Sequence, residues 1–167
     1  MTAIFWVPAL APVRLAVVER PRGGPWLSDD LAAFRRGGID ILVSALQPKE
    51  ERDLSLLDEE RHAIEAGLEF VRFPIANLGA PPMEVAIPIL GRLADAARAG
   101  RAVAAHCWAS QGRSPTIIAA VSVLLGHHPD HVWPAIREAR GIPVPDTNEQ
   151  RAWVASIAAA LPRPEAR

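Results

Sequence analysis

The stretch IDILVSAL, at residues 39–46, is apolar at nearly every position. Short, continuous apolar runs of this kind are typical of strands that are buried on both faces of a parallel sheet. Two further strands are predicted at LEFVRFPI (68–75) and RAVAAHC (101–107). Near the N-terminus, IFWVPA (4–9) and RLAVVE (14–19) are predicted to form a hairpin of short strands. The chain is therefore expected to build a sheet of four or five strands.

Helix-like segments alternate with these strands. The predicted helices span residues 25–38, 49–66, 83–100, 114–128, 130–140 and 148–161. Ser114 is predicted to cap the fourth of them, with Pro115 at its first position. This alternation favours an α/β domain, in which a single central, mostly parallel sheet carries helices on both faces. Sheets of this class bind ligands beyond the carboxyl ends of their strands, and Cys107 lies at one such end.

The length of 167 residues suits one domain. We expect that domain to span residues 1–161 and residues 162–167 to form a frayed C-terminal tail. Half of the residues are apolar and 22% are charged, which supports a sizeable core and argues against global disorder. The net charge of −1 gives no reason to expect nucleic acid or a membrane surface as a partner.

The expected location is the cytoplasm. No segment approaches 18 consecutive apolar residues without a charge or a proline, so no transmembrane helix is predicted. The N-terminus lacks a basic start before its apolar run, unlike a secretory signal. Cys107 is the only cysteine, which excludes an internal disulfide framework and a zinc site built from several cysteines.

Arg113 follows Cys107 by six positions, directly before a predicted helix. A tight loop at this place aims its backbone N–H groups at an anion, and the helix N-terminus adds unpaired donors. Arg113 can bind two phosphate oxygens at once, and Gly112 permits the turn. The same donors stabilise a thiolate, which is the nucleophilic form of cysteine. Ser114 is placed to donate to the sulfur, and His106 to orient the loop.

The spacing of Cys107 and Arg113 is by itself a weak signal, because arginine is common in this chain. The alternative is a small buried cysteine at a strand end and an arginine at the surface. The context favours the anion-binding loop: a histidine precedes the cysteine, a glycine precedes the arginine, and a hydroxyl residue follows.

With these residues in place, HCWASQGRS (106–114) resembles the H-C-x5-R-[ST] signature of cysteine-dependent protein tyrosine phosphatases, specifically the small, bacterial dual-specificity type. FPIANLGAPP (73–82) is similar to the acid loop of that family, and RGIPVPDTNEQ (140–150) to a segment frequent in its small bacterial members. The resemblance implies that Cys107 attacks phosphorus and that water hydrolyses the cysteinyl-phosphate, with no metal and no cofactor. The residues implied to bind the phosphate are Trp108, Ala109, Ser110, Gln111, Gly112 and Arg113.

The family pattern places an aspartate, the general acid, where this chain has Asn77. Three interpretations stay open. In the first, another carboxyl group replaces the missing general acid, and Asp146 and Glu84 are the candidates. Asp146 could equally be an ordinary turn residue, and Glu84 an ordinary residue at a helix N-terminus. Alternatively, the enzyme is slow and works best on aryl esters such as phosphotyrosine, whose phenolate leaves with less help. In the third, the chain is a phosphate-binding module, a pseudophosphatase.

Gln150 resembles the glutamine that places the hydrolytic water in many relatives, and the alternative is an ordinary polar residue in the first turn of the last helix. The function expected from the resemblance is hydrolysis of phosphotyrosine on proteins, with phosphoserine and phosphothreonine as further candidates. Its partners are then a phosphorylated protein or a small phosphomonoester, and phosphate-like anions in the loop.

Overall fold

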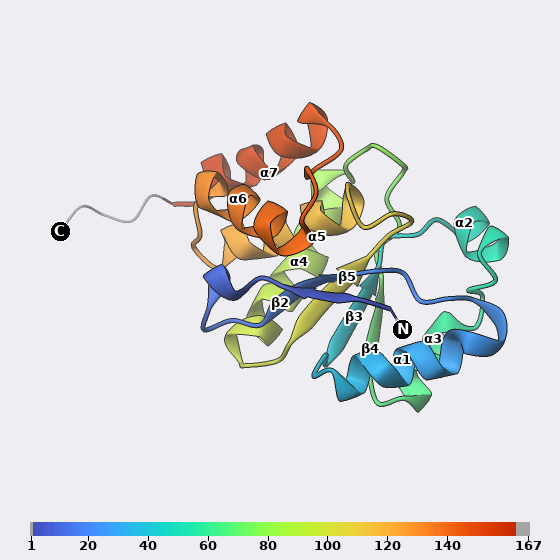
Figure 1. Cartoon of the computed structure of the whole chain (residues 1–167). Helices are drawn as coiled ribbons and strands as arrows, with labels where there is room; N and C mark the ends of the chain where they lie inside the picture. The colour runs from blue at the N-terminus through green and yellow to red at the C-terminus, as the bar shows by residue number, and fades with distance from the viewer. Residues whose placement is uncertain (1, 163–167) are drawn as a thin grey trace.

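A five-stranded sheet runs through the middle of the molecule in the order β1-β2-β5-β3-β4 (Figure 1). The strands are β1 (Ile4–Trp6), β2 (Leu15–Val18), β3 (Ile41–Ser44), β4 (Glu69–Arg72) and β5 (Val103–His106). β1 and β2 pair antiparallel as the predicted hairpin, and all other neighbours are parallel. This computed structural model describes residues 2–162, so residues 163–167 of the predicted tail lie outside the described residues.

The three inner strands are buried at every position, as their apolar sequences predict. β2, β5 and β3 have helices or other chain segments over both faces, and no residue in them is exposed. β4 lies at the edge of the sheet, and its last residue, Arg72, is exposed. The prediction of a single, mostly parallel sheet is therefore confirmed.

Helices cover both faces of the sheet (Figure 1). On one face lie α1 (Leu27–Arg36) and α3 (Glu59–Glu65), whose apolar side chains share a core with Leu42 and Ala104. On the other face lie the helices that share a core with Val43 and Ala105, namely α4 (Met83–Arg98), α5 (Arg113–Leu124), α6 (Pro129–Arg140) and α7 (Asn148–Ala160). α5 is buried along almost its whole length, which fits its nearly unbroken apolar sequence.

Shorter helical pieces complete the structure, and one of them corrects the sequence prediction. Two 3₁₀ turns, η1 (Pro8–Leu10) and η2 (Gly24–Trp26), precede β2 and α1. The single helix predicted over residues 49–66 is instead α2 (Pro48–Asp53) followed by α3. The helix breaks because Ser55 adopts a left-handed backbone with φ of 57°, a conformation that a right-handed helix does not contain.

The start of α5 also differs from the prediction. α5 begins at Arg113 with Gly112 as its cap, so Ser114 lies inside the first turn and does not cap the helix. The physical reason is that the Gly112 carbonyl already accepts from the Thr116 N–H, which closes the first turn one residue earlier, while the Ser114 hydroxyl donates to the Cys107 sulfur, 3.4 Å away.

Four parallel strands end at one edge of the sheet, at Val18, Ser44, Arg72 and His106. The loops that follow these strands therefore gather at that edge. α2 lies there too, because it begins only four residues after β3 ends. Within residues 2–162, no helix combines the length and the hydropathy that crossing a bilayer requires.

Two leucines provide a matched test of the two-sided core. Leu42 is fully buried in β3, whereas Leu57 is 60% exposed between α2 and α3. We expect Leu42→Ala to lower the free energy of unfolding by about 2–5 kcal/mol, because it leaves a cavity. Leu57→Ala should change it by no more than about 0.5 kcal/mol. Urea unfolding of both variants measures the difference, and similar losses in both would contradict the described packing.

Candidate active site

Cys107 stands directly after β5, at the carboxyl edge of the sheet. Only 3% of the residue is exposed, and the Ser114 hydroxyl donates to its Sγ at 3.4 Å. Residues 107–112, here named the Cys107 loop, connect β5 to α5. The parallel register brings Ser44 of β3 beside His106 of β5, which places the end of β3 next to the start of this loop.

The carbonyl groups of the Cys107 loop are held on its outer side by two arginines. The Trp108 carbonyl accepts a hydrogen bond from Arg20 Nη1 at 2.5 Å, and the Ser110 carbonyl accepts one from Arg140 Nε at 2.8 Å. These arginines come from the segment after β2 and from the end of α6. Three segments that are distant in sequence thereby fix the orientation of successive peptide groups.

Fixing the carbonyls also fixes the N–H groups. In a trans peptide the C=O and the following N–H point in opposite directions. The N–H groups of Ala109 and Gln111 therefore point away from the two arginines, to the inner side of the loop. The Gly112 carbonyl accepts from the N–H and the hydroxyl of Thr116, so the next N–H, that of Arg113, points back towards the loop. The loop is thus lined by donors, as an anion cradle requires.

Ser110 has an unusual backbone for a residue with a side chain, with φ of 54°. Glycine adopts this conformation freely, whereas other residues do so at a cost. Here the Ser110 hydroxyl donates to the carbonyl of Val18, the last residue of β2, at 2.6 Å, and the residue is buried. This bond offsets part of the cost and anchors the loop to the neighbouring strand.

Arg113 is 2% exposed and lies under the Cys107 loop. Its Nη1 donates to Glu50 Oε2 at 2.7 Å and to the Ile75 carbonyl at 3.0 Å, and its Nη2 donates to Glu50 Oε1 at 2.8 Å. These contacts leave the Nε–H and one Nη2–H for another acceptor, a pair that matches two oxygens of a phosphate. Burial lowers the pKa of Arg113, but the bonds to Glu50 and the nearby Cys107 outweigh it and raise that pKa.

Glu50 is a site residue that the sequence interpretation missed. It belongs to α2, and burial raises its pKa, but the hydrogen bonds from Arg113 and from the Gln47 backbone outweigh this and hold the pKa below its ordinary value. A signal for it existed: the charged segment begins just beyond the carboxyl end of β3, where ligands of such sheets bind. The ion pair joins the segment after β3 to the start of α5.

His106 lies apart from the ligand side of the loop. Its Nε2 is 2.7 Å from Glu59 Oε1, and both side chains are fully buried. Glu59 begins α3, so this pair lies on the sheet face that α1 and α3 cover. Among residues 2–162, the ring and the carboxylate have no other polar partner. His106 is thus held below the loop by a carboxylate that the sequence interpretation also missed.

A hollow of about 480 Å³ opens above Cys107 and is named the Cys107 hollow. Its lining includes Cys107, Arg113 and Gly112, and also Asn77 and Asp146. Glu84, the other candidate acid, is exposed in the first turn of α4 and does not line the hollow. The remaining lining residues are Lys49, Glu50, Asp53, Trp108 and Ala109.

The Asp146 carboxylate lies directly against the Cys107 loop. A β-carbon placed on Gly112 would collide with Asp146 Oδ2 and would lie 2.9 Å from its Cγ. Gly112 has an ordinary φ of −103°, so a side chain there would meet the Asp146 carboxylate, and the backbone conformation itself would allow one. The structure therefore brings one of the two candidate acids to the loop and leaves the other at the surface.

Gln150 is buried and links two loops around the hollow. Its Oε1 accepts from the N–H groups of Asp146 and Thr147 at 3.1 and 3.2 Å, and its Nε2 donates to the Gly79 carbonyl at 3.2 Å. It is also the third residue of α7, where it completes a capping box with Thr147. Gln150 thus ties the Asp146 loop to the segment that carries Asn77. Gln111 is only partly buried and does not line the hollow.

The fold is shared with solved phosphatase structures. Kinase-associated phosphatase, with its catalytic-site cysteine replaced by serine, aligns over 95% of this chain and 97% of its own with a TM-score of 0.81 at 17% identity. Tk-PTP in the active form aligns over 91% and 95% with a TM-score of 0.74 at 22% identity. PTPMT1 in complex with PI(5)P aligns over 86% and 90% with a TM-score of 0.67 at 16% identity. At these identities the likeness concerns the fold.

Sequence comparison gives a family as well. The family described as "Polymorphic toxin system, DSP-PTPase phosphatase" matches residues 16–127, which is more than half of the chain. The matched range runs from β2 to the end of α5 and includes the whole Cys107 loop. No curated protein sequence matches the chain significantly.

The ion pair between Glu50 and Arg113 predicts a pH-dependent loss of stability. Glu50→Gln should lower the free energy of unfolding at pH 7 by roughly 2–3 kcal/mol, because a buried guanidinium loses its charged partner. The pKa of Glu50 is lowered by folding, so its contribution is present above the ordinary carboxyl pKa of 4.5 and is lost as the pH falls through the lower, folded-state pKa. Urea unfolding from pH 7 to pH 3 should show the wild type and the variant converging in acid.

The control for this experiment is Glu84→Gln, which removes an exposed carboxylate from the first turn of α4. It should cost less than about 1 kcal/mol at any pH. A constant difference between wild type and Glu50→Gln across the pH range would contradict the role given to the ion pair.

Proposed function

The chain belongs to the DSP-PTPase phosphatase family of polymorphic toxin systems, and from this premise we propose that it hydrolyses phosphomonoesters through a cysteinyl-phosphate, with phosphotyrosine on proteins as its main substrate. One observation carries the proposal: the Cys107 thiol lies at the floor of a loop lined by N–H donors, with Arg113 and Ser114 beside it. Such a site holds a phosphate dianion directly in line with a nucleophile.

In the first step, the N–H groups of the loop and the free edge of Arg113 bind the phosphate oxygens. The Cys107 thiolate attacks phosphorus, the S–P bond forms, and the bond between phosphorus and the ester oxygen breaks. The leaving oxygen takes a proton from the Asp146 carboxyl group, which lines the same hollow. The products of this step are the dephosphorylated alcohol or phenol and the cysteinyl-phosphate.

In the second step, water attacks the cysteinyl-phosphate. Asp146, now a carboxylate, accepts a proton from the water as the new P–O bond forms. The S–P bond breaks, and the Ser114 hydroxyl, 3.4 Å from Sγ, stabilises the departing thiolate. Inorganic phosphate leaves and the thiolate is restored. Gln150 supports this step by holding the backbone of Asp146.

Three features support an aryl phosphate as the substrate. The Cys107 hollow, of about 480 Å³, is large enough for a phosphorylated phenyl ring. Trp108 stands at its rim and is 40% exposed, so it offers an aromatic surface to that ring. A phenolate also needs less protonation than an alkoxide when it leaves.

We place the protein in the cytoplasm, where a lone thiol stays reduced.

A second candidate function rests on Asn77, which lines the hollow at the position of the family's acid. An amide cannot donate a proton to the leaving group as a carboxylic acid does. The protein would then bind phosphorylated partners without turning them over. The carboxylate of Asp146 beside Gly112 favours the enzyme over this binding module.

The first test is hydrolysis of an aryl phosphate in steady state and in a single turnover. Wild-type protein should release phenol and phosphate and accumulate a phosphorylated form that mass spectrometry locates at Cys107. Cys107→Ser should lower the rate by several orders of magnitude and still bind the substrate, because the cradle is unchanged. Equal rates for both proteins would refute the enzyme, and a tight complex of the wild type without turnover would support the binding module.

The second test identifies the proton donor. Asp146→Asn should lower kcat by about 10²–10⁴ on a phenyl phosphate. The loss should shrink as the substrate's leaving phenol becomes more acidic, and the fall in rate on the basic side of the pH profile should disappear. Glu84→Gln serves as the comparison. A loss of kcat in Glu84→Gln, with none in Asp146→Asn, would contradict the assignment of Asp146 as the proton donor.

A gain-of-function variant separates the remaining interpretations. If Asp146 donates the proton, Asn77→Asp should raise kcat by less than about tenfold, because the acid is already present. A larger gain would mean that the natural site lacks an effective acid. The measurement is kcat on phenyl phosphate for the single variants and for Asn77→Asp combined with Asp146→Asn.

A further inference from the structure

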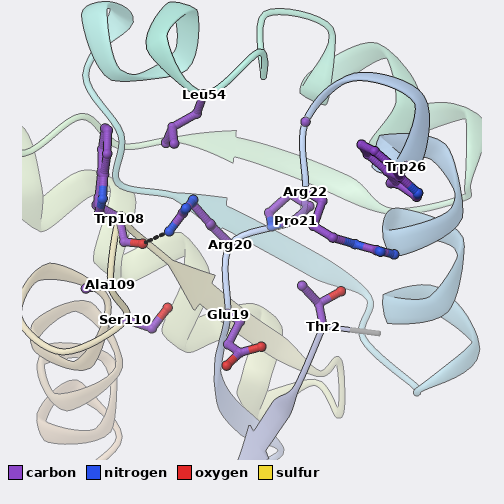
Figure 2. Close-up of a pocket in the computed structure, with 11 residues that line it drawn as sticks. Thr2, Glu19, Arg20, Pro21, Arg22, Trp26, Leu54, Trp108, Ala109 and Ser110 are labelled. Carbon is purple, nitrogen blue, oxygen red and sulfur yellow. Dashed lines mark hydrogen bonds between the residues drawn. The ribbon is translucent and has the colours of Figure 1, made fainter.

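A second hollow, of about 520 Å³, lies beside the Cys107 loop (Figure 2). One side of it is formed by the loop itself, at Trp108, Ala109 and Ser110. The other side is formed by residues 19–23, which follow β2, and by Trp26 of η2. Trp108 and Ala109 line both this hollow and the Cys107 hollow. The two hollows are therefore neighbours that share one wall.

Arg20 is the central charged group of this second hollow, which we name the Arg20 hollow. Figure 2 shows its side chain reaching towards Trp108, where Nη1 donates to the backbone carbonyl at 2.5 Å. Its guanidinium also lies 5.5 Å from the centroid of the Trp108 ring. Across residues 2–162, no carboxylate lies within ion-pair distance of Arg20. Its charge is therefore available to a ligand.

The other charged residues of the Arg20 hollow are Arg22, which is paired with a carboxylate, and Glu19, which accepts from the backbone. Arg22 makes a two-pronged contact with Asp30, with Nη2 to Oδ1 at 2.7 Å and Nε to Oδ2 at 3.0 Å. The Glu19 carboxylate accepts from the backbone N–H of Ala3 at 3.1 Å, and Figure 2 shows it turned away from Trp108. Among residues 2–162, Arg20 is thus the arginine of this hollow that has no carboxylate partner, and it stands on the Trp108 side, whereas the Glu19 carboxylate is turned away from Trp108. A negatively charged ligand group therefore fits best beside Arg20 and Trp108.

The walls of the Arg20 hollow are apolar and partly exposed. Trp26 is 53% exposed and Trp108 is 40% exposed, although both are large apolar side chains. Exposed aromatic side chains at a hollow are frequent in binding sites. Leu54 contributes from the segment between α2 and α3, opposite Pro21 (Figure 2). Such walls fit the methylene groups of a side chain whose end is charged.

We propose that the Arg20 hollow binds an acidic side chain, a glutamate or an aspartate, that lies close to the phosphorylated residue in a peptide substrate. The inference rests on the proposed phosphatase function and adds a determinant of its specificity. The shared wall of Trp108 and Ala109 supports it, because residues near the phosphotyrosine in an extended peptide are only about 3.3–3.6 Å per residue further along. Arg20 meets the carboxylate, and the tryptophans meet the methylene groups.

The experiment uses pairs of phosphotyrosine peptides that differ only by glutamate or glutamine at each of the two positions before and after the phosphotyrosine. The readout is the ratio of kcat/KM for the glutamate peptide to that for the glutamine peptide, which cancels any general effect of a variant on the loop. Wild-type protein should prefer glutamate by roughly fivefold at one position, as expected for a partly exposed ion pair. Raising the salt concentration should reduce that ratio.

Variants at Arg20 assign the preference. Arg20→Gln should bring the ratio to about one, and Arg20→Glu should reverse it and favour a lysine peptide. The matched control is Arg36→Gln, an exposed arginine at the end of α1, near the opposite edge of the sheet. It should leave the ratio unchanged. A wild-type ratio of one at every position, or a preference that persists in Arg20→Glu, overturns the proposal.

The outcome is separable from that of the phosphatase proposal. If no peptide is turned over, dissociation constants are measured instead with the Cys107→Ser variant, and tighter binding of the glutamate peptide that is lost when Arg20→Gln is added supports the Arg20 hollow. If the wild type hydrolyses all peptides equally, the phosphatase stands and the inference fails. A preference for a second phosphate on a soluble inositol phosphate, with none for peptide charge, also overturns it.

Discussion

The orientation of the peptide groups in the Cys107 loop is the constraint on which the site depends. A chain of carbonyls facing a thiolate would repel any anion, and the loop avoids this only because Arg20 and Arg140 hold two of its carbonyls outward. These arginines come from distant parts of the chain, after β2 and at the end of α6. The inward direction of the N–H groups thus depends on long-range contacts, since the loop sequence by itself does not choose which way each peptide group points.

A second layer of electrostatic order lies below the loop. Arg113 and Glu50 form an ion pair, and His106 Nε2 lies 2.7 Å from Glu59 Oε1; all four side chains are largely or fully shielded from water. Each pair connects the strand or helix next to Cys107 with the segments that follow β3. A positive charge placed under the loop favours anions, while its carboxylate partner keeps it from being an unpaired charge in the core. The arrangement leaves one edge of Arg113 for the ligand.

The sequence predicted the sheet and the Cys107 loop because both depend on local information. Continuous apolar runs identify buried strands, and the Cys-Arg spacing lies within one loop. Glu50, Glu59 and Arg20 were missed because each reaches the site only through the fold, from residues that look like an ordinary charged helix or surface segment. The break at Ser55 was missed for a related reason: the left-handed residue is followed by Leu56, which is fully buried in the core, and nothing in the local helix propensity indicates it. The roles of His106, Gln150 and the other site residues stay predictions.

Gly112 connects the loop to the question of the proton donor. A glycine before the arginine suggests a turn that needs conformational freedom, yet its φ of −103° suits any residue. What a side chain would meet there is the Asp146 carboxylate. The Asp146 carboxylate, from another segment, therefore approaches the loop where Gly112 has no side chain, while Asn77 stands at the position that resembles the acid position of the family. An acid supplied after α6 and an amide supplied after β4 reach the same hollow, so the proposed proton transfer requires only that the donor come from a different loop, with the nucleophile and its cradle unchanged.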